Sequence, residues 1–219
     1  MRIKLFEEFS EWDGDEFLFD LYFMSKEEVN ALFWGEFRKR EPHAEKIKVM
    51  IESGLVDMSL RDRNGWTPLH IVSINNKVDI VKVLISSEKV DVDAIDNEME
   101  GSLHMASEYD NVVVAQLLIE AGANIELEGR INRWTPLHIA SQYNSVKVAE
   151  LLIRRRANLE ARSRENWTPL HLASMNNSIG VAKLLIGAGA DVNAEDKWEN
   201  TPLHRAQSDE MRALLGGGL

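Results

Sequence analysis

The 219-residue sequence lacks cysteine, long hydrophobic runs and the common catalytic motifs. Without cysteine, disulfides and thiolate metal sites are excluded. A membrane-spanning helix needs about 18 or more consecutive apolar residues, and no such run exists. The Gly-x-Ser-x-Gly elbow, a phosphate-binding glycine loop and the His-Glu-x-x-His helix are also missing. These absences predict a protein that is not an enzyme, holds no cofactor and does not insert into a membrane.

Positive charge is in short supply, since 25 Lys and Arg residues face 36 Asp and Glu residues, for a net charge of −11. An acidic surface repels phosphate backbones, so we expect no nucleic-acid partner. The first 24 residues also lack the basic flank and the uninterrupted apolar stretch of a signal peptide. The sequence therefore predicts a cytoplasmic or nuclear protein, although a chain whose leader had been removed would look the same.

What is present is a repeat. A Leu-His pair recurs five times, at spacings of 34, 34, 33 and 33 residues. A unit of about 33 residues cannot bury its own apolar face, so neighbouring units must stack into a solenoid that presents a binding surface. The pairs are Leu69-His70, Leu103-His104, Leu137-His138, Leu170-His171 and Leu203-His204.

Four of these pairs belong to the sequence Thr-Pro-Leu-His, which is a compact helix start. Threonine at the N-cap accepts a hydrogen bond from a first-turn amide, and proline at N1 loses none. The second copy has Gly101-Ser102 instead, so its helix is predicted to be the most weakly capped, and restoring Thr-Pro there is expected to stabilise the fold. Nine positions after each helix start lies a residue that tolerates the left-handed conformation, which predicts the helix end. These residues are Asn76, Asp110, Asn144 and Asn177.

The unit resembles the ankyrin repeat, whose pattern is Thr-Pro-Leu-His-x-Ala on the first helix and Gly-Ala-Asp-Val-Asn near the hairpin. Residues 189–193 match the second part, and the resemblance covers residues 62 to about 215. It implies an all-α solenoid of stacked helix-turn-helix units with β-hairpin fingers and a concave face that binds partner proteins. It also implies that each repeated histidine forms hydrogen bonds within its capping turn and to a neighbouring repeat.

The histidines are not predicted to bind metal. Adjacent repeats lie about 10 Å apart, the width of a helix, whereas zinc needs nitrogen ligands about 2 Å from one ion. A row of histidines at that spacing cannot share an ion.

The repeats divide the chain into four segments. Residues 1–24 form an acidic, aromatic segment that we expect to pack over the first repeat, with a partner-binding motif as the alternative. Residues 25–61 resemble a degenerate N-terminal capping repeat. Residues 62–195 contain four full repeats, and residues 196–219 contain a C-terminal capping repeat and a tail.

Both ends carry predicted caps. The helices of the first capping repeat are expected to start at Ser25, with Glu28 completing a capping box, and at Pro42. In the last repeat, Arg205 stands where the other copies have an apolar residue, which predicts a polar end face. With both ends capped, we expect a monomer.

Tryptophans beside the helix starts are the first group of candidate partner-binding residues. Trp66, Trp134 and Trp167 each precede a capping threonine, and Trp198 lies two residues further back in its own finger. Trp134 and Trp167 are predicted to form one contiguous patch that anchors the partner at little cost to folding. The alternative is that the indoles stack on one another as a structural ladder.

A second group lies just before each first helix ends, which the resemblance places on the variable inner face. With Glu100, these residues are Ile74, Asn75, Glu108, Tyr109, Gln142, Tyr143, Met175 and Asn176.

The sequence thus predicts a non-catalytic protein-protein interaction module that binds a partner through its concave face and aromatic fingertips. The alternative is an acidic inhibitor that masks a basic transcription factor or an enzyme. Acidic residues expected near the binding face support it: Glu98, Glu100, Glu108, Glu165 and Glu199. Salt separates the two hypotheses, because an acidic masking surface loses association rate steeply as ionic strength rises.

Overall fold

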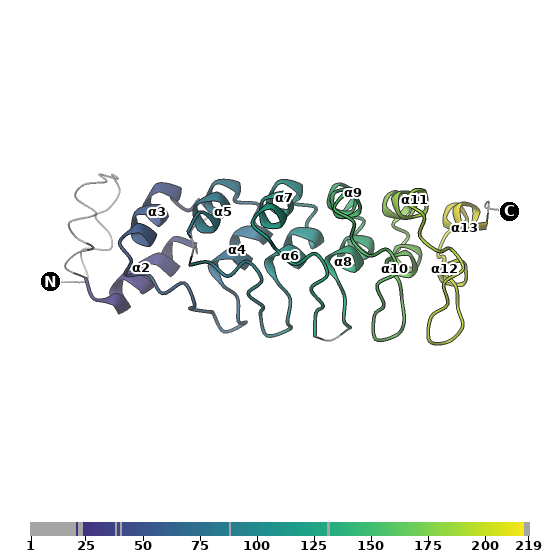
Figure 1. Ribbon diagram of the computed structural model, residues 1–219, viewed down its shortest axis with the longest axis horizontal. Coiled ribbons are helices and arrows are strands. Elements are labelled where there is room, and N and C mark those ends of the chain that lie inside the picture. Colours follow the sequence, from purple (N-terminus) through teal and green to yellow (C-terminus); the bar gives the residue numbers. More distant parts are fainter. Residues whose placement is uncertain are drawn as a thin grey trace.

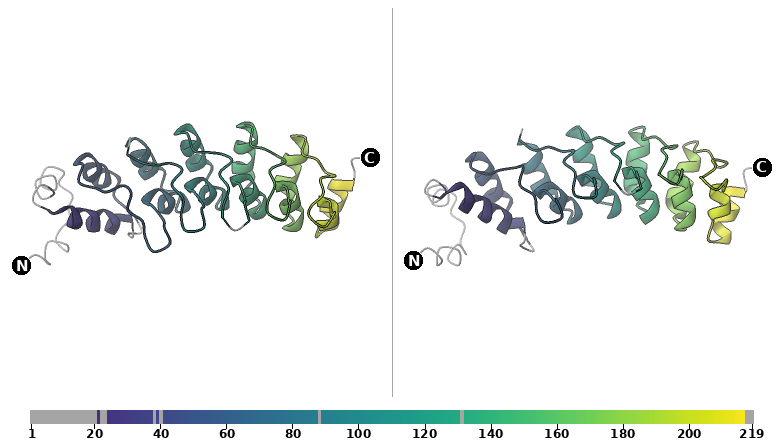
Figure 2. Two further views of the ribbon diagram at one scale, coloured as in Figure 1. Left: turned by 60° about the horizontal axis from the view of Figure 1, so that its bottom comes forward. Right: turned by 90° about the horizontal axis from the view of Figure 1, so that it is seen from below.

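The computed structural model describes residues 21, 24–37, 39, 41–87, 89–130 and 132–216. Over these residues the chain forms helix pairs that stack in a single row, with the two termini at opposite ends (Figures 1 and 2). One helix of each pair lies in the layer next to the loops, and these inner helices are α2 (Lys26–Phe37), α4 (Pro68–Ile74), α6 (Ser102–Glu108), α8 (Pro136–Tyr143), α10 (Pro169–Met175) and α12 (Pro202–Arg205). The outer helices are α3 (Ala44–Glu52), α5 (Val78–Ile85), α7 (Val112–Glu120), α9 (Val146–Arg154), α11 (Ile179–Gly187) and α13 (Asp209–Gly216).

The inner helices begin and end where the repeated pattern predicts. Proline occupies the first turn of α4, α8, α10 and α12. Each predicted stop is in the left-handed region, with φ of 52° at Asn76, 53° at Asp110, 54° at Asn144 and 55° at Asn177. Two of these side chains also bind the outer helix of the following repeat. The Val148 N–H of α9 donates to Asp110 Oδ1 at 2.9 Å, and the Val181 N–H of α11 donates to Asn144 Oδ1 at 3.3 Å.

The first capping helix has the predicted start, and the second does not. The Ser25 N–H donates to Glu28 Oε2 at 2.8 Å, and the Glu28 N–H donates to Ser25 Oγ at 3.2 Å, which completes the capping box. The start at Pro42 is one residue too early, because the N-cap of α3 is His43, which is extended, and the helix begins at Ala44.

The loops between helix pairs extend to one side as fingers, but the predicted β-hairpin strands are not seen in the described residues. Within the described part of the chain, an isolated bridge joins Ile95 and Gly101. In the first finger the Asp62 N–H donates to the Trp66 carbonyl at 3.0 Å, and Asp62 Oδ1 accepts from the N–H groups of Asn64 and Trp66. These two backbone N–H groups bind the aspartate side chain and not a neighbouring strand. The finger therefore closes as a tight turn.

The hydrophobic core runs along the row between the two layers. Leu84, Leu118, Leu152 and Leu185 of the outer helices are fully buried in it. Buried alanines, such as Ala140, let neighbouring inner helices approach closely. None of the described helices is long and apolar enough to cross a membrane.

The ends of the row differ from its middle. The predicted packing of residues 1–24 lies outside the described residues, apart from Leu21, which is buried, and Met24. At the other end Leu203 is 40% exposed, whereas the equivalent Leu170 is fully buried against the next repeat. The last helix pair therefore keeps a partly apolar end face beside its polar residues.

Candidate functional site

The repeated histidines hold the inner helices to the fingers. In each copy a backbone N–H at the N-cap donates to the histidine Nδ1, at 3.0 to 3.2 Å. The Nε2 of four of them then contacts a carbonyl oxygen of the following finger at 3.0 to 3.1 Å. Those histidines are His70, His104, His138 and His171. Both contacts implied by the resemblance are confirmed.

These histidines are held neutral. Burial lowers the pKa of His138 to about 4, and it lowers the pKa values of His70, His104 and His171 in the same direction. Because Nδ1 accepts from the backbone, the ring proton lies on Nε2 and donates to the carbonyl. No cluster of three or more potential metal ligands occurs among the described residues.

A hollow of about 370 Å³ lies between the inner ends of α4 and α6 and the fingers that precede them. The two repeats contribute equivalent positions to its walls. Trp66 and Glu100 each precede a helix start. Ile74 and Glu108 each lie near a helix end. Five sequence-predicted residues line this hollow: Trp66, Ile74, Glu100, Glu108 and Tyr109. The others lining it are Asn64, Asp96, Asn97, Glu98 and Met105.

The hollow is strongly acidic. Burial, followed by repulsion from Asp96, Glu108 and Glu98, raises the pKa of Glu100 to about 7. None of the ion pairs formed by the described residues involves these four carboxylates. Asp96 is engaged by neutral donors instead, since it accepts the Trp66 indole N–H at 3.0 Å and two backbone N–H groups. No ion pair of the described residues therefore neutralises these carboxylates, although the Arg130 guanidinium reaches the Asn97 carbonyl at the edge of the hollow.

The remaining helix-end residues follow at successive steps along the row. Tyr143, at the end of α8, is 49% exposed, close to the 53% of Tyr109, the C-cap of α6. Gln142 and Met175 are half-buried, and Asn176 is exposed. One residue falls outside this line, because Asn75 borders a separate hollow of about 450 Å³ beside α2.

The tryptophans connect one finger to the next. The Trp66 Nε1–H donates to Asp96 Oδ2 at 3.0 Å, and the Trp167 Nε1–H donates to Asp196 Oδ2 at 3.2 Å. Trp134 Nε1 is buried and has no partner among the described residues, because the equivalent position in the next finger is Ser163. Sequence reasoning missed these aspartates, although an aspartate precedes three helix starts by five positions.

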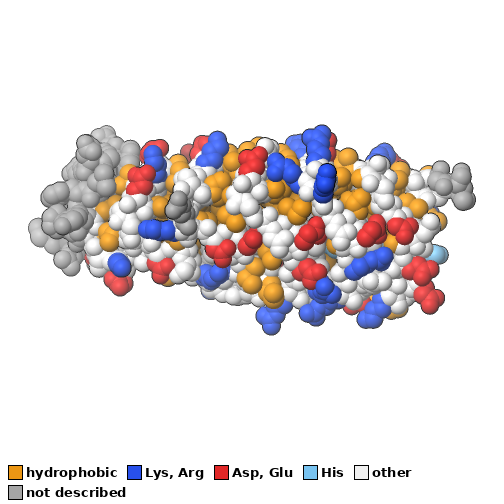
Figure 3. Space-filling model, viewed as in Figure 1, with side chains coloured by type: hydrophobic (Ala, Val, Ile, Leu, Met, Phe, Trp, Pro, Cys, Tyr) orange, Lys and Arg blue, Asp and Glu red, His pale blue; other side chains and the backbone are white. Residues whose placement is uncertain are grey.

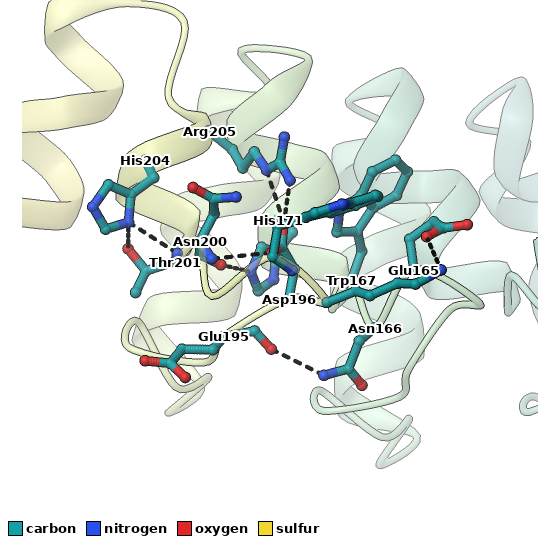
Figure 4. A network of polar contacts seen from close by, with 12 residues as sticks. Glu165, Asn166, Trp167, His171, Glu195, Asp196, Asn200, Thr201, His204 and Arg205 are labelled. Atoms are coloured by element: carbon teal, nitrogen blue, oxygen red, sulfur yellow. Dashed lines mark hydrogen bonds and ion pairs between the residues drawn. The ribbon is translucent and has the colours of Figure 1, made fainter.

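An aromatic cluster lies at the C-terminal end of the row (Figure 4). The rings of Trp167 and Trp198 lie 6.3 Å apart, and the Arg205 guanidinium lies 5.9 and 5.3 Å from their respective centres. Arg205 also forms an ion pair with Asp196. Burial would raise the pKa of Asp196, but hydrogen bonds from Arg205 and from two backbone N–H groups outweigh it and lower that pKa to about 2.

This geometry differs from the contiguous Trp134–Trp167 patch that the sequence suggested. Among the described residues, the indole in ring contact with Trp167 is Trp198, and Trp134 has no ring contact with either. Trp198, displaced by two positions in its finger, lies beside Trp167, and the Arg205 guanidinium lies near both rings. Trp167 is thus tied into the fold, and its replacement is expected to affect folding as well as binding.

Comparison with protein-family models identifies ankyrin repeats in three overlapping matches, at residues 39–129, 103–196 and 159–216. Comparison with curated proteins found no match. The family matches extend over most of the sequence and over every described helix from α3 to α13. With its repeated helix pairs, capping histidines and projecting fingers, the chain belongs to the ankyrin repeat family.

Proposed function

We propose that this protein is a non-catalytic interaction module that binds one partner protein along its inner surface. By inner surface we mean the ends of α4, α6, α8 and α10 together with the residues that precede each inner helix. Ankyrin repeats are generally modules for protein-protein interaction. The observation that carries the proposal is the gathering of five predicted contact residues from two repeats around one hollow.

Exposed aromatic side chains support this assignment. Tyr109 and Tyr143 end successive inner helices and leave about half of their surface in solvent. Tyrosine in such a place offers a large apolar area with a polar tip, which is typical of interface hot spots. The proposed contact set is Trp66, Ile74, Asn75, Glu100, Glu108, Tyr109, Trp134, Gln142, Tyr143, Trp167, Met175, Asn176 and Trp198.

The mechanism is rigid presentation. The histidine and tryptophan bonds between repeats fix the inner surface before any partner arrives. Little conformational entropy is then lost on binding, and a surface spanning several repeats can bury about 1,200 to 2,000 Å². We propose that a monomer in the cytoplasm or nucleus carries out this function.

Affinity purification with mass spectrometry, followed by binding measurements on the purified partner, tests the proposal. Replacing Tyr109 and Tyr143 together by Ala is expected to weaken binding by about 2 kcal/mol or more, with little change in stability. Val113→Ala is the matched control, because Val113 is 49% exposed but lies on the outer helix α7. Equal binding by the double variant and the control would refute the proposal.

The acidic inhibitor is the second candidate, and the uncompensated carboxylates of the hollow favour it. Acidic and basic side chains are interspersed over the face shown in Figure 3, so that face is not uniformly acidic. A masking inhibitor would lose association rate steeply between low and high salt. A weak salt dependence together with strong tyrosine effects would favour the interaction module.

A further inference from the structure

We propose that the hollow between α4 and α6 binds an arginine side chain from a basic segment of the partner protein. The inference rests on the proposed partner-binding function and names the chemistry of one contact within it.

The strongest support is an arginine site that the chain already contains. At its C-terminal end, Arg205 lies over the rings of Trp167 and Trp198 and pairs with Asp196, which also accepts the Trp167 indole N–H (Figure 4). The same tryptophan–aspartate pair recurs at the hollow. Trp66 donates its indole N–H to Asp96, at positions equivalent to Trp167 and Asp196.

The hollow differs from that site in having no arginine of its own. The position equivalent to Arg205 is Met105, which is buried beneath the hollow. Tyr109 supplies the second aromatic ring of the hollow, as Trp198 does at the Arg205 site. It is exposed at the end of α6 and lies opposite the helix starts. A guanidinium from outside could therefore meet aromatic surface and carboxylate together, as Arg205 does.

The second repeat has acidic residues at two positions where the other copies have uncharged ones. The residue before the helix start is Trp66, Trp134, Trp167 or Asn200 in the other copies, but Glu100 in the second. The position seven after the N-cap is Ile74, Gln142 or Met175 in the other full repeats, but Glu108 in the second. Both acidic replacements thus fall in one repeat and line one hollow.

Arginine fits this chemistry better than lysine. Its planar guanidinium stacks on aromatic rings and donates two parallel hydrogen bonds to a carboxylate. The carboxylates of Glu100 and Glu108 have no ion pair among the described residues, although Glu108 shares a side-chain hydrogen bond with Tyr143. A carboxylate has about four acceptor positions, so both can accept bonds from a guanidinium. A lysine ammonium is a strongly hydrated point charge that gains less from the aromatic walls.

The test uses the full chain labelled with ¹⁵N and the capped peptide acetyl-Gly-Gly-Arg-Gly-Gly-amide. Titration to roughly 20 mM at pH 8 is expected to shift the Trp66 indole N–H signal saturably, with a millimolar dissociation constant, and to leave the Trp167 signal in place. The matched peptides carry citrulline, which has the same shape without the charge, or lysine. Citrulline is expected not to bind, and lysine is expected to bind more weakly than arginine.

Variants locate the contact. Glu100→Gln and Glu108→Gln are each expected to weaken arginine binding by about threefold to tenfold. Glu150→Gln on the outer helix α9 removes the same charge elsewhere and is expected to leave binding unchanged. Unfolding curves of each variant confirm that it is folded.

Three results would overturn the arginine assignment: an unmoved Trp66 signal, equal binding of the citrulline or lysine peptide, or equal effects of Glu150→Gln and Glu100→Gln. Failure of the broader function looks different. If a purified partner loses binding to the Tyr109/Tyr143 variant but binds Glu100→Gln and Glu108→Gln normally, the interaction surface stands and only the arginine site is refuted.

Discussion

The indole nitrogen of Trp134 shows that each finger relies on the next one for a hydrogen-bond acceptor. Asp96 accepts two backbone N–H groups through Oδ1 and the Trp66 indole through Oδ2. Ser163 occupies the same position but has one oxygen, which already accepts from the N–H groups of Glu165 and Trp167. The buried donor of Trp134 is left without an acceptor among the described residues, and such a group costs stability.

Ser163→Asp is therefore expected to stabilise the fold by about 1 kcal/mol, because the second carboxylate oxygen would accept the Trp134 indole N–H. Urea unfolding of the variant and the parent measures the gain. A double-mutant cycle with Trp134→Phe provides the control, because the gain should vanish once the indole N–H is absent. A gain that persists in the Phe background would have another origin.

Glu100 makes a different contribution at the residue scale, through its pKa of about 7 against an ordinary value of 4.5. Between these values the folded state binds the proton more tightly than the unfolded state, so stability falls as pH rises through this window. The cost is absent below pH 4.5 and fully present above pH 7. Partial exposure of the side chain reduces it to about 1 kcal/mol.

Glu100→Gln is accordingly expected to raise stability by about 1 kcal/mol at pH 8 and to leave it unchanged at pH 4. Unfolding free energies at the two pH values measure the effect, with Glu150→Gln as the control for loss of one negative charge. An equal gain at both pH values would mean that ionisation of Glu100 is not its cause.

At the scale of elements, α6 departs most from the sequence pattern that the other inner helices share. Its N-cap is Gly101, which has no side-chain oxygen, and Ser102 at N1 has a buried hydroxyl without a partner among the described residues. The sequence suggested restoring Thr-Pro at both positions. A threonine there would require the end of the Leu127 side chain to move, because a Cβ on Gly101 would lie 2.8 Å from Leu127 Cδ2.

Ser102→Pro alone is expected to stabilise the protein by about 0.5 to 1 kcal/mol, because proline restricts the unfolded chain and removes the unpaired hydroxyl. Gly101 before it is extended, with φ of −98° and ψ of 173°, as proline requires of its predecessor. Thermal unfolding measures the gain. Gly101→Thr serves as the comparison and is expected to stabilise less, because Leu127 must move to admit its Cβ, so the reverse order of the two melting temperatures would contradict this account.

The sequence predicted the helices well because their starts and stops depend on local chemistry. Threonine, proline and the left-handed asparagines act within a few residues, so their effects are visible in the pattern. Pro42 was misleading because proline is compatible with the first turn of a helix but does not by itself fix the residue at which the helix begins. The acidic hollow and the Arg205 cluster could not be predicted, because they depend on contacts about 30 residues apart and on which charges lack a partner.

At the scale of the whole molecule, four buried histidines link successive repeats. Their neutral rings are required in the folded state, whereas the unfolded chain protonates them near the ordinary value of 6.5. For His138, with a pKa of about 4, stability is lost as pH falls from 6.5 toward 4. Each link joins neighbours only, so the array responds as a chain of coupled units.

Lowering the pH from 7 to 5 is expected to destabilise the fold by about 2 kcal/mol through His138 alone, at roughly 1.4 kcal/mol per pH unit within the window. Urea unfolding at several pH values measures this, and the Glu100→Gln background removes the opposing contribution of that carboxyl. His138→Gln is expected to flatten the profile, and an unchanged slope in that variant would show that the loss arises elsewhere.

The left-handed stops of the inner helices carry a consequence for cooperativity. Glycine adopts that conformation most easily, yet the chain uses Asp110 and Asn144 there. Their side chains bind the outer helix of the following repeat. Glycine at these positions would leave each helix pair intact while removing a bond between neighbours. In a one-dimensional Ising description, these residues contribute to the interface energy between neighbouring repeats and not to the intrinsic stability of each repeat. They determine whether the array melts as one body or unravels from its ends.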